Sequence, residues 1–145
     1  MRRLTLAAAV LALLPLAPLA AQTPEDSLAI RATAEDYLLG WYDGDAARME
    51  RALHPELAKR QVATMDNGRS RFSNMGAMAM VQMTRGRAGS PQPADQRLLE
   101  IEMLDVGRTM AVVKITSWDF IDLVSMAKSN GRWVIVNDLW DGRPR

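Results

Sequence analysis

Three features of the sequence predict an α+β fold in which three N-terminal helices pack on a curved antiparallel sheet. Apolar residues recur at helical spacing in the first part of the chain. Side chains alternate between apolar and polar from Arg97 onward, and Asn130-Gly131 separates two segments rich in β-forming residues. A run of helices followed by a run of strands is typical of α+β domains. The chain has 145 residues, 48% of them hydrophobic and 24% charged, which fits one domain over residues 22–145.

Each predicted helix has a polar residue at its start and a recognisable end. The predicted N-caps are Thr23, Asp45 and either Ser73 or Asn74, and the helices are expected to end near Gly44, Pro55 and Arg85. Pro24 suits the first position of the first helix, because its missing N–H would be unpaired there in any case. Pro55 ends the second helix, because a residue that precedes proline leaves the helical region.

The remaining segments are expected to form the sheet. Residues 57–65 read as a polar strand, which we place at a sheet edge. From Arg97 onward the period of two predicts a strand that continues through a turn into a second one. A three-residue loop at 106–108 would pair Ile101 with Val113 and Glu100 with Lys114, which matches apolar with apolar and acid with base.

The Asn130-Gly131 pair predicts a tight hairpin, because both residues accept the positive φ angles of a type I′ turn. A two-residue loop fixes the register of the flanking strands. It would pair Lys128 with Trp133, Met126 with Ile135, Val124 with Asn137 and Asp122 with Leu139. Toward the far end of this face Asp122 and Asn137 become diagonal polar neighbours on an otherwise apolar surface. Burying such groups is costly unless they have partners or a use.

The first 21 residues have the pattern of a secretory signal peptide. Arg2-Arg3 is followed by an apolar run from Leu4 to Leu14 and by Ala20-Ala21, which is typical of a cleavage site before Gln22. We therefore expect an exported protein, periplasmic or secreted, with an uncleaved N-terminal anchor as the alternative. The absence of cysteine favours a bacterial periplasm over a eukaryotic secreted module.

Charge and composition exclude several classes of function. The whole chain has a formal charge of +1, and removing residues 1–21 takes away two arginines and no acids, which leaves −1. No basic block remains, so nucleic-acid binding lacks its electrostatic footprint. With one histidine and no cysteine we expect no zinc site, and no nucleotide-binding glycine motif is present, so no cofactor is expected.

The order and spacing of several motifs resemble the putative lumazine-binding family. The residues that carry the resemblance are Tyr37, Trp41, Tyr42, Gly44 and Asp45, then Leu53-His54-Pro55-Glu56-Leu57, and finally Phe120, Asp122, Gly131, Trp133, Ile135 and Asn137. This family belongs to the nuclear transport factor 2-like (ketosteroid isomerase/SnoaL-like) superfamily, and the resemblance covers residues 25–140. It implies a cone of curved sheet and helices around a pocket.

The superfamily also contains ketosteroid isomerases, which offers a comparison by residue. Tyr37 corresponds to the tyrosine that stabilises an oxyanion in those enzymes, and Asp122 lies near the position of their protonated aspartic acid. Their general-base carboxylate should lie on the strand after the second helix. Here that segment, residues 58–62, contains no acid, so the resemblance does not carry the isomerase mechanism over to this chain.

Four residues are the expected ligand contacts: Asp122, Asn137, Tyr37 and Trp41. The candidate catalytic residues are Asp122, Tyr37 and His54. Each has a structural alternative. Asp122 would be a carboxylate hydrogen-bonded to backbone or Asn137, Tyr37 a core residue with its hydroxyl on a carbonyl, and His54 a helix cap.

Three functions remain open at this point. The chain is expected to be an exported protein that binds a small organic molecule in the cone. The alternatives are an acid/base lyase or isomerase, and a non-catalytic dimerisation module whose cone is filled by its own side chains. A homodimer is expected in each case, because Met110, Val112 and Trp118 would make the outer sheet face unusually apolar.

Overall fold

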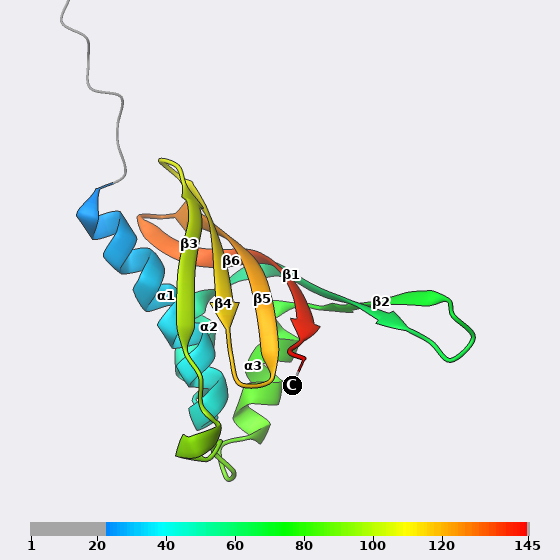
Figure 1. The fold of residues 1–145 in the computed structure, drawn as a ribbon. Coiled ribbons are helices and arrows are strands. Elements are labelled where there is room, and N and C mark those ends of the chain that lie inside the picture. Colours follow the sequence, from blue (N-terminus) through cyan, green and yellow to red (C-terminus); the bar gives the residue numbers. More distant parts are fainter. Residues whose placement is uncertain (1–22, 145) are drawn as a thin grey trace, which may run out of the picture.

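Three α-helices pack on a six-stranded curved sheet in the computed structural model, which describes residues 23–144 (Figure 1). The elements are α1 Pro24–Asp43, α2 Ala46–Ala52, β1 Leu53–Thr64, β2 Ser70–Met75, α3 Ala77–Gly86, a 3-10 turn Ala94–Gln96, β3 Glu100–Val106, β4 Met110–Thr116, β5 Phe120–Ser129 and β6 Arg132–Gly142. The α+β prediction is therefore confirmed. The predicted signal peptide lies outside the described residues, and no helix among residues 23–144 is long and apolar enough to cross a membrane.

The sheet has the strand order β2-β1-β6-β5-β4-β3. All neighbouring strands are antiparallel except β1 and β6, which are parallel, so the sheet is mostly rather than wholly antiparallel. It curves around the helices, and the far part of the β1–β2 hairpin projects from the body (Figure 1). The inner face of the sheet and the helices together enclose the hydrophobic core.

The first two helices begin as the sequence predicts. The Thr23 hydroxyl accepts a hydrogen bond from the Asp26 amide at 3.1 Å, and Asp45 accepts from the Ala47 and Arg48 amides. Gly44 ends α1 with a φ of 68°. A Cβ at Gly44 would also lie 2.5 Å from the Ala88 amide nitrogen, so glycine is required there twice over.

The segment before the third helix is a strand, so the predicted cap at Ser73 or Asn74 is wrong. Residues 70–75 form β2 at the edge of the sheet, and α3 begins only after Gly76. Strand β1, expected at an edge, lies instead between β2 and β6. Its polar residues fit this position because beyond Arg60 it pairs with β2 alone and leaves the body of the protein.

The β5–β6 hairpin follows the predicted register only as far as a β-bulge. Asn130 and Gly131 have positive φ angles of 50° and 77°, and Lys128 and Met126 pair as predicted with Trp133 and Ile135. An extra residue, Val136, then interrupts the ladder. Beyond it the pairs are Ser125 with Asn137, Val124 with Asp138, Leu123 with Leu139 and Asp122 with Trp140.

This bulge exchanges the two faces of the end of β6. Asn137 and Leu139, expected to face inward, are exposed, while Asp138 is 2% exposed and Trp140 turns toward the core. The predicted partners of Val124 and Asp122 are therefore wrong, for the physical reason that a one-residue shift reverses side-chain direction.

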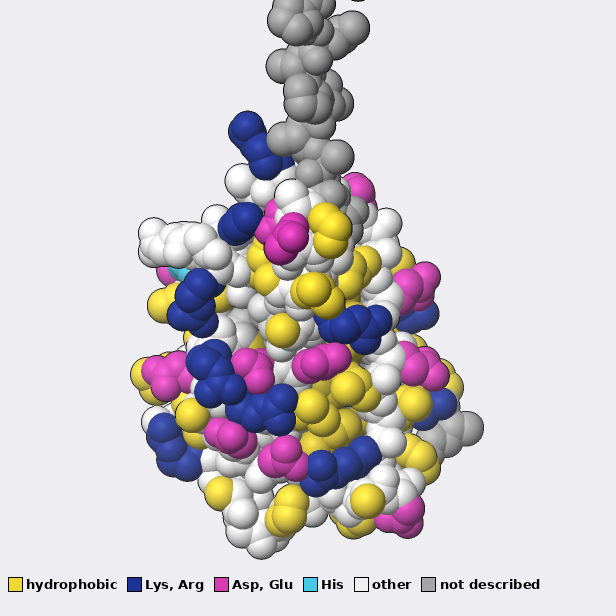
Figure 2. Space-filling model, turned by 90° about the vertical axis from the view of Figure 1, so that its left-hand side faces the viewer, with side chains coloured by type: hydrophobic (Ala, Val, Ile, Leu, Met, Phe, Trp, Pro, Cys, Tyr) yellow, Lys and Arg dark blue, Asp and Glu magenta, His cyan; other side chains and the backbone are white. Residues whose placement is uncertain are grey.

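The β3–β4 pairing also differs from the prediction. Ile101 pairs with Ile115 rather than Val113, and Glu102, not Glu100, lies opposite Lys114. Because this shift is two residues, the apolar face is kept, and Ala111, Val113 and Ile115 are buried as the alternation predicts. The side of the molecule on which α1 lies is shown in Figure 2, where acidic and basic side chains are interspersed.

Candidate functional site

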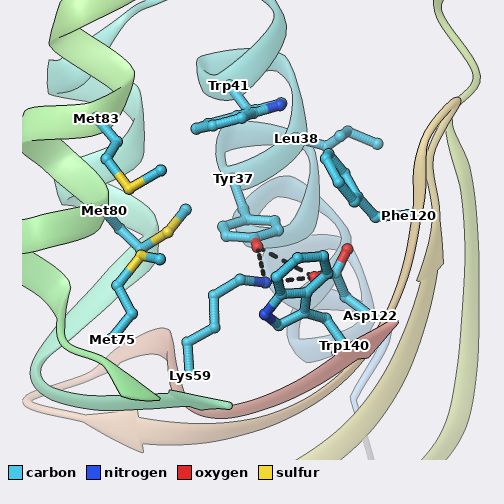
Figure 3. Close-up of a pocket in the computed structure, with 10 residues that line it drawn as sticks. All are labelled: Tyr37, Leu38, Trp41, Lys59, Met75, Met80, Met83, Phe120, Asp122 and Trp140. Atoms are coloured by element: carbon cyan, nitrogen blue, oxygen red, sulfur yellow. Dashed lines mark hydrogen bonds and ion pairs between the residues drawn. The ribbon is translucent and has the colours of Figure 1, made fainter. Parts of the chain in front are cut away.

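A cavity of about 130 Å³ lies between the helices and the inner face of the sheet. Figure 3 shows its walls, which come from α1, β1, β2, α3, β5 and β6. The lining residues are Tyr37, Leu38, Trp41, Lys59, Met75, Met80, Met83, Phe120, Asp122 and Trp140. Most of these side chains are apolar. The three polar ones, Tyr37, Lys59 and Asp122, lie together, so the cavity has a polar end and an apolar end.

The polar end is built around the ammonium group of Lys59. Its Nζ atom lies 2.8 Å from the Tyr37 hydroxyl and 2.6 Å from Asp122 Oδ1. It also lies 2.5 Å from Oδ2 of Asp138, which sits behind the cavity wall. The side chains of Lys59, Asp122 and Asp138 are 7%, 3% and 0% exposed, so this is a buried ion cluster.

Four different elements place these groups. Tyr37 comes from the buried stripe of α1 and Asp122 from the inner face of β5. Lys59 pairs directly with Asp138 across the parallel β1–β6 ladder. The stem of Lys59 crosses the core, and its ammonium group lies 5.0 Å from the Trp140 ring centroid.

Burial and mutual repulsion set the protonation of the cluster. Burial first, and the charge of Asp122 second, raise the pKa of Asp138 to about 7, although Lys59 and Tyr37 partly oppose this. Burial and the two carboxylates raise the pKa of Tyr37 well above its ordinary value. Tyr37 therefore keeps its proton at neutral pH, and it can donate to Asp138 at 3.1 Å or to Asp122 at 3.3 Å.

Aromatic rings and methionines form the apolar end. Phe120 makes edge contacts with both Trp41 and Trp140, at centroid distances of 6.4 Å and 5.2 Å. Met75, Met80 and Met83 line the opposite wall (Figure 3). Thioethers on flexible stems adapt to the shape of whatever they contact, so this wall can change its outline.

The structure brings together three of the five residues that the sequence singles out. Tyr37, Asp122 and Trp41 line the cavity. Asn137 lies on the other face of the sheet, on the exposed side of the bulge. His54 lines a separate surface hollow, where its Nδ1 accepts a hydrogen bond from the Glu56 amide at 3.2 Å, so it cannot act together with Tyr37 and Asp122.

Two members of the cluster, Lys59 and Asp138, are missing from the sequence prediction. Lys59 carries a signal that could have been used, because it is two residues after Leu57 and therefore shares its inward direction in a strand. Asp138 carries none, since the bulge that turns it inward has no clear mark in the sequence. Within residues 23–144 no group of three potential metal ligands is present.

The comparison that decides the family is with protein-family models. The model described as "Putative lumazine-binding" matches residues 25–141. The chain belongs to this lumazine-binding family. No curated protein sequence matches the chain.

Solved structures similar to this member of the lumazine-binding family share its fold. A nuclear transport factor 2-like protein of unknown function from Silicibacter pomeroyi has a TM-score of 0.69 at 19% identity, with 85% of this chain and 100% of that chain covered. A similar protein from Methylobacillus flagellatus has a TM-score of 0.63 at 20% identity, with 85% and 96% covered. A ketosteroid isomerase-like protein from Erwinia carotovora atroseptica has 0.60 at 15%, with 85% and 100% covered. The predicted nuclear transport factor 2-like fold is thereby confirmed.

Proposed function

We propose that the chain is an exported binding protein that holds a small organic molecule in the cavity of the cone. One observation carries this proposal: about 130 Å³ of space is kept open in the core beside a buried ion cluster. An apolar cavity of about 150 Å³ in another protein is large enough to bind benzene, so a molecule built on one ring suits this site. The description of the family as lumazine-binding agrees with a small cyclic ligand.

The open cavity argues against a cone filled by its own side chains. A module that served only for dimerisation would gain stability from a filled core, because each unfilled volume forfeits packing contacts. The proposal of export rests on the sequence pattern of residues 1–21. We also propose a homodimer, formed through the outer face of the sheet.

Native mass spectrometry of the protein purified from its own host tests binding and export together. We expect the mass of a chain that starts at Gln22, with a small molecule that is released on denaturation. An intact chain from Met1 in the cytoplasm would contradict export. An unliganded protein that also takes up no small molecule would contradict binding.

A matched pair of variants on α3 tests whether the ligand occupies the cavity. Met83 lines the cavity and is 47% exposed, so Met83→Trp should take up space beside the cavity without overfilling the core. Met78 lies on the same helix, is 68% exposed and does not line the cavity. We expect ligand affinity to fall at least about tenfold in Met83→Trp and to stay unchanged in Met78→Trp. Equal affinities would place the ligand elsewhere.

An acid/base lyase or isomerase is the second candidate. It is favoured by the convergence of Tyr37, Lys59 and Asp122 with Asp138, whose pKa of about 7 lets it hold or release a proton near neutrality. Because Asp138 does not line the cavity, a proton would reach the ligand through Asp122 or Tyr37. Incubating the bound molecule in heavy water would reveal such an activity as deuterium at a carbon atom, and a pure binder would show none.

A further inference from the structure

The hydrogen-bond donors at the polar end of the cavity are already bonded to acceptors within the ion cluster. A lysine ammonium group has three protons. Lys59 has three acceptors within 2.8 Å, which are the Tyr37 hydroxyl and one oxygen each of Asp122 and Asp138. Lys59 therefore has no proton left for a ligand.

The Tyr37 hydroxyl is committed in the same way. Its oxygen accepts from Lys59, and its single proton points to carboxylate oxygens at 3.1 Å and 3.3 Å. A hydroxyl that gives its proton to a carboxylate cannot also give it to an incoming carbonyl. The tyrosine is thus unavailable as a donor in the resting arrangement of the site.

Among the residues that line the polar end of the cavity, Asp122 has one carboxylate oxygen that remains unused. Asp122 bonds to Lys59 and Tyr37 through Oδ1 alone, and within the described part of the chain no hydrogen bond reaches its Oδ2. Among the described residues, the side-chain oxygen that is both fully buried and without a hydrogen-bond partner is Oδ1 of Asp138. Oδ2 of Asp122 also lacks a partner, so it is not fully buried. Figure 3 shows one carboxylate oxygen of Asp122 turned away from Lys59.

We propose that the molecule held in this cavity carries a hydrogen-bond donor, best a cationic nitrogen, on a ring-sized apolar body, with the donor bound by Asp122. This inference rests on the proposed binding function and adds the chemical class of the ligand. The polarity is the reverse of an oxyanion-stabilising site: the protein accepts and the ligand donates.

The charge of the cluster favours the same class of ligand. One ammonium group faces two carboxylates, so the cluster carries excess negative charge whenever both acids are ionised. An anionic ligand group placed beside Asp122 would lose its water and meet a like charge, whereas a cation would restore neutrality. The apolar remainder of the ligand would pack on Trp41, Phe120 and Met80.

Four small molecules with the same ring test the proposal on the full mature chain. Benzylamine offers a cationic donor, benzyl alcohol a neutral donor, benzoate an anionic acceptor, and toluene only the apolar body. We expect benzylamine to bind at least about tenfold more tightly than benzoate in calorimetry, with benzyl alcohol between them. Toluene should bind as well, because the apolar cavity alone accepts its ring.

The outcomes separate failure of this inference from failure of the proposed function. Benzoate binding as tightly as benzylamine, or toluene binding without benzylamine, would overturn the ligand class and leave the binding cavity intact. Binding of none of the four would overturn both.

Variants then locate the contact. Asp122→Asn should weaken benzylamine at least about tenfold and leave toluene nearly unchanged, because only the carboxylate contact is lost. Asp66→Asn, at the exposed tip of the β1–β2 hairpin, is the matched loss of one acid and should change neither. Equal benzylamine affinity in Asp122→Asn and wild type would overturn the assignment.

Discussion

Lys59 is the residue on which the polar end of the cavity depends. A buried lysine is costly in free energy unless its charge is paired, and here Asp122 and Asp138 lie within 2.6 Å of its nitrogen. The reverse also holds, because either carboxylate without Lys59 would be a buried uncompensated charge. Such clusters contribute little net stability but fix the positions of their members, which suits a site that must present one oxygen in one direction.

The titration of Asp138 should make stability depend on pH. Its pKa of about 7 in the folded protein exceeds the ordinary value of 3.8. Between these values the folded state holds more protons than the unfolded state, so the free energy of unfolding falls as pH rises and levels off above about pH 7. Asp138→Asn removes this loss. We expect the variant to gain roughly 1–3 kcal/mol relative to wild type between about pH 4 and pH 8, measured by urea unfolding.

The titratable groups that act on Asp138 are Lys59 from β1, Tyr37 from α1 and Asp122 from β5. Asp66→Asn, which removes an exposed acid, is the control. Its free energy of unfolding should change with pH in parallel with that of wild type. If the free energy of unfolding of Asp138→Asn also changes with pH in parallel with wild type, Asp138 is ionised throughout this pH range in the folded protein.

At the scale of elements, the bulge at Val136 decides which side chains reach the cavity. Without it, Asn137 and Leu139 would face inward and Asp138 would face solvent. One inserted residue thus replaces an amide by a carboxylate and an aliphatic wall by the Trp140 ring. Bulges are common beside functional sites for this reason, since they redirect a side chain while the strand continues.

The features that the sequence predicts correctly are the local ones. Caps at Thr23 and Asp45 and the turn at Asn130-Gly131 follow from the conformational preferences of single residues. Strand β2 and the bulge lie outside the prediction because each is defined by pairing with a neighbouring strand, which the residue pattern of one segment does not record. The same limit explains the site: the polar position of Asp122 on an apolar hairpin face and the family resemblance of Tyr37 point to these two residues, while Asp138 appears only once the register is known.

Trp133 joins the hairpin to the start of α1, and its loss should be costly. It is 3% exposed, and its Nε1 atom donates to Asp26 at 2.8 Å. Hydrogen bonds from Lys128 and Trp133 lower the pKa of Asp26. We expect Trp133→Ala to lower the free energy of unfolding by roughly 3–5 kcal/mol, because it leaves a large cavity. Trp133→Phe keeps an aromatic side chain but loses the hydrogen bond and part of the indole volume, which should cost about 1–2 kcal/mol.

Urea denaturation of both variants checks this expectation. A loss below about 1 kcal/mol in Trp133→Ala would mean that the hairpin does not anchor the helix layer.

At the scale of the whole molecule, the cone has a covered face and an uncovered one. The helices cover the inner face, and the outer face carries Leu123 and Leu139 as a directly paired couple, 44% and 51% exposed. Met110 lies on this face as the sequence predicts, at 60% exposed. Trp118 does not, because it packs partly buried against the core.

Further exposed apolar side chains lie on the projecting β1–β2 hairpin. Val62 and Phe72 pair there and are 44% and 67% exposed. They lie on the same side as Leu139, because Leu139 pairs with Arg60, two residues before Val62. These exposed apolar side chains lie on one side of the sheet, with the exposed Arg60 between Leu139 and Val62, and a second copy of the same face would cover them with twofold symmetry.

We therefore expect the mature protein to sediment as a homodimer at tens of micromolar, with about 800 Å² buried on each partner. Leu123→Glu places two charges near the centre of a twofold interface, one from each copy, and should weaken the dimer by more than about tenfold. Leu28→Glu is the matched control, because Leu28 is 69% exposed but lies on α1, away from the sheet. It should leave the dimer intact. A wild-type monomer at this concentration would contradict the dimer. A dimer that survives Leu123→Glu but dissociates in Leu28→Glu would move the interface to the helices, and the outer face of the sheet would then need another partner.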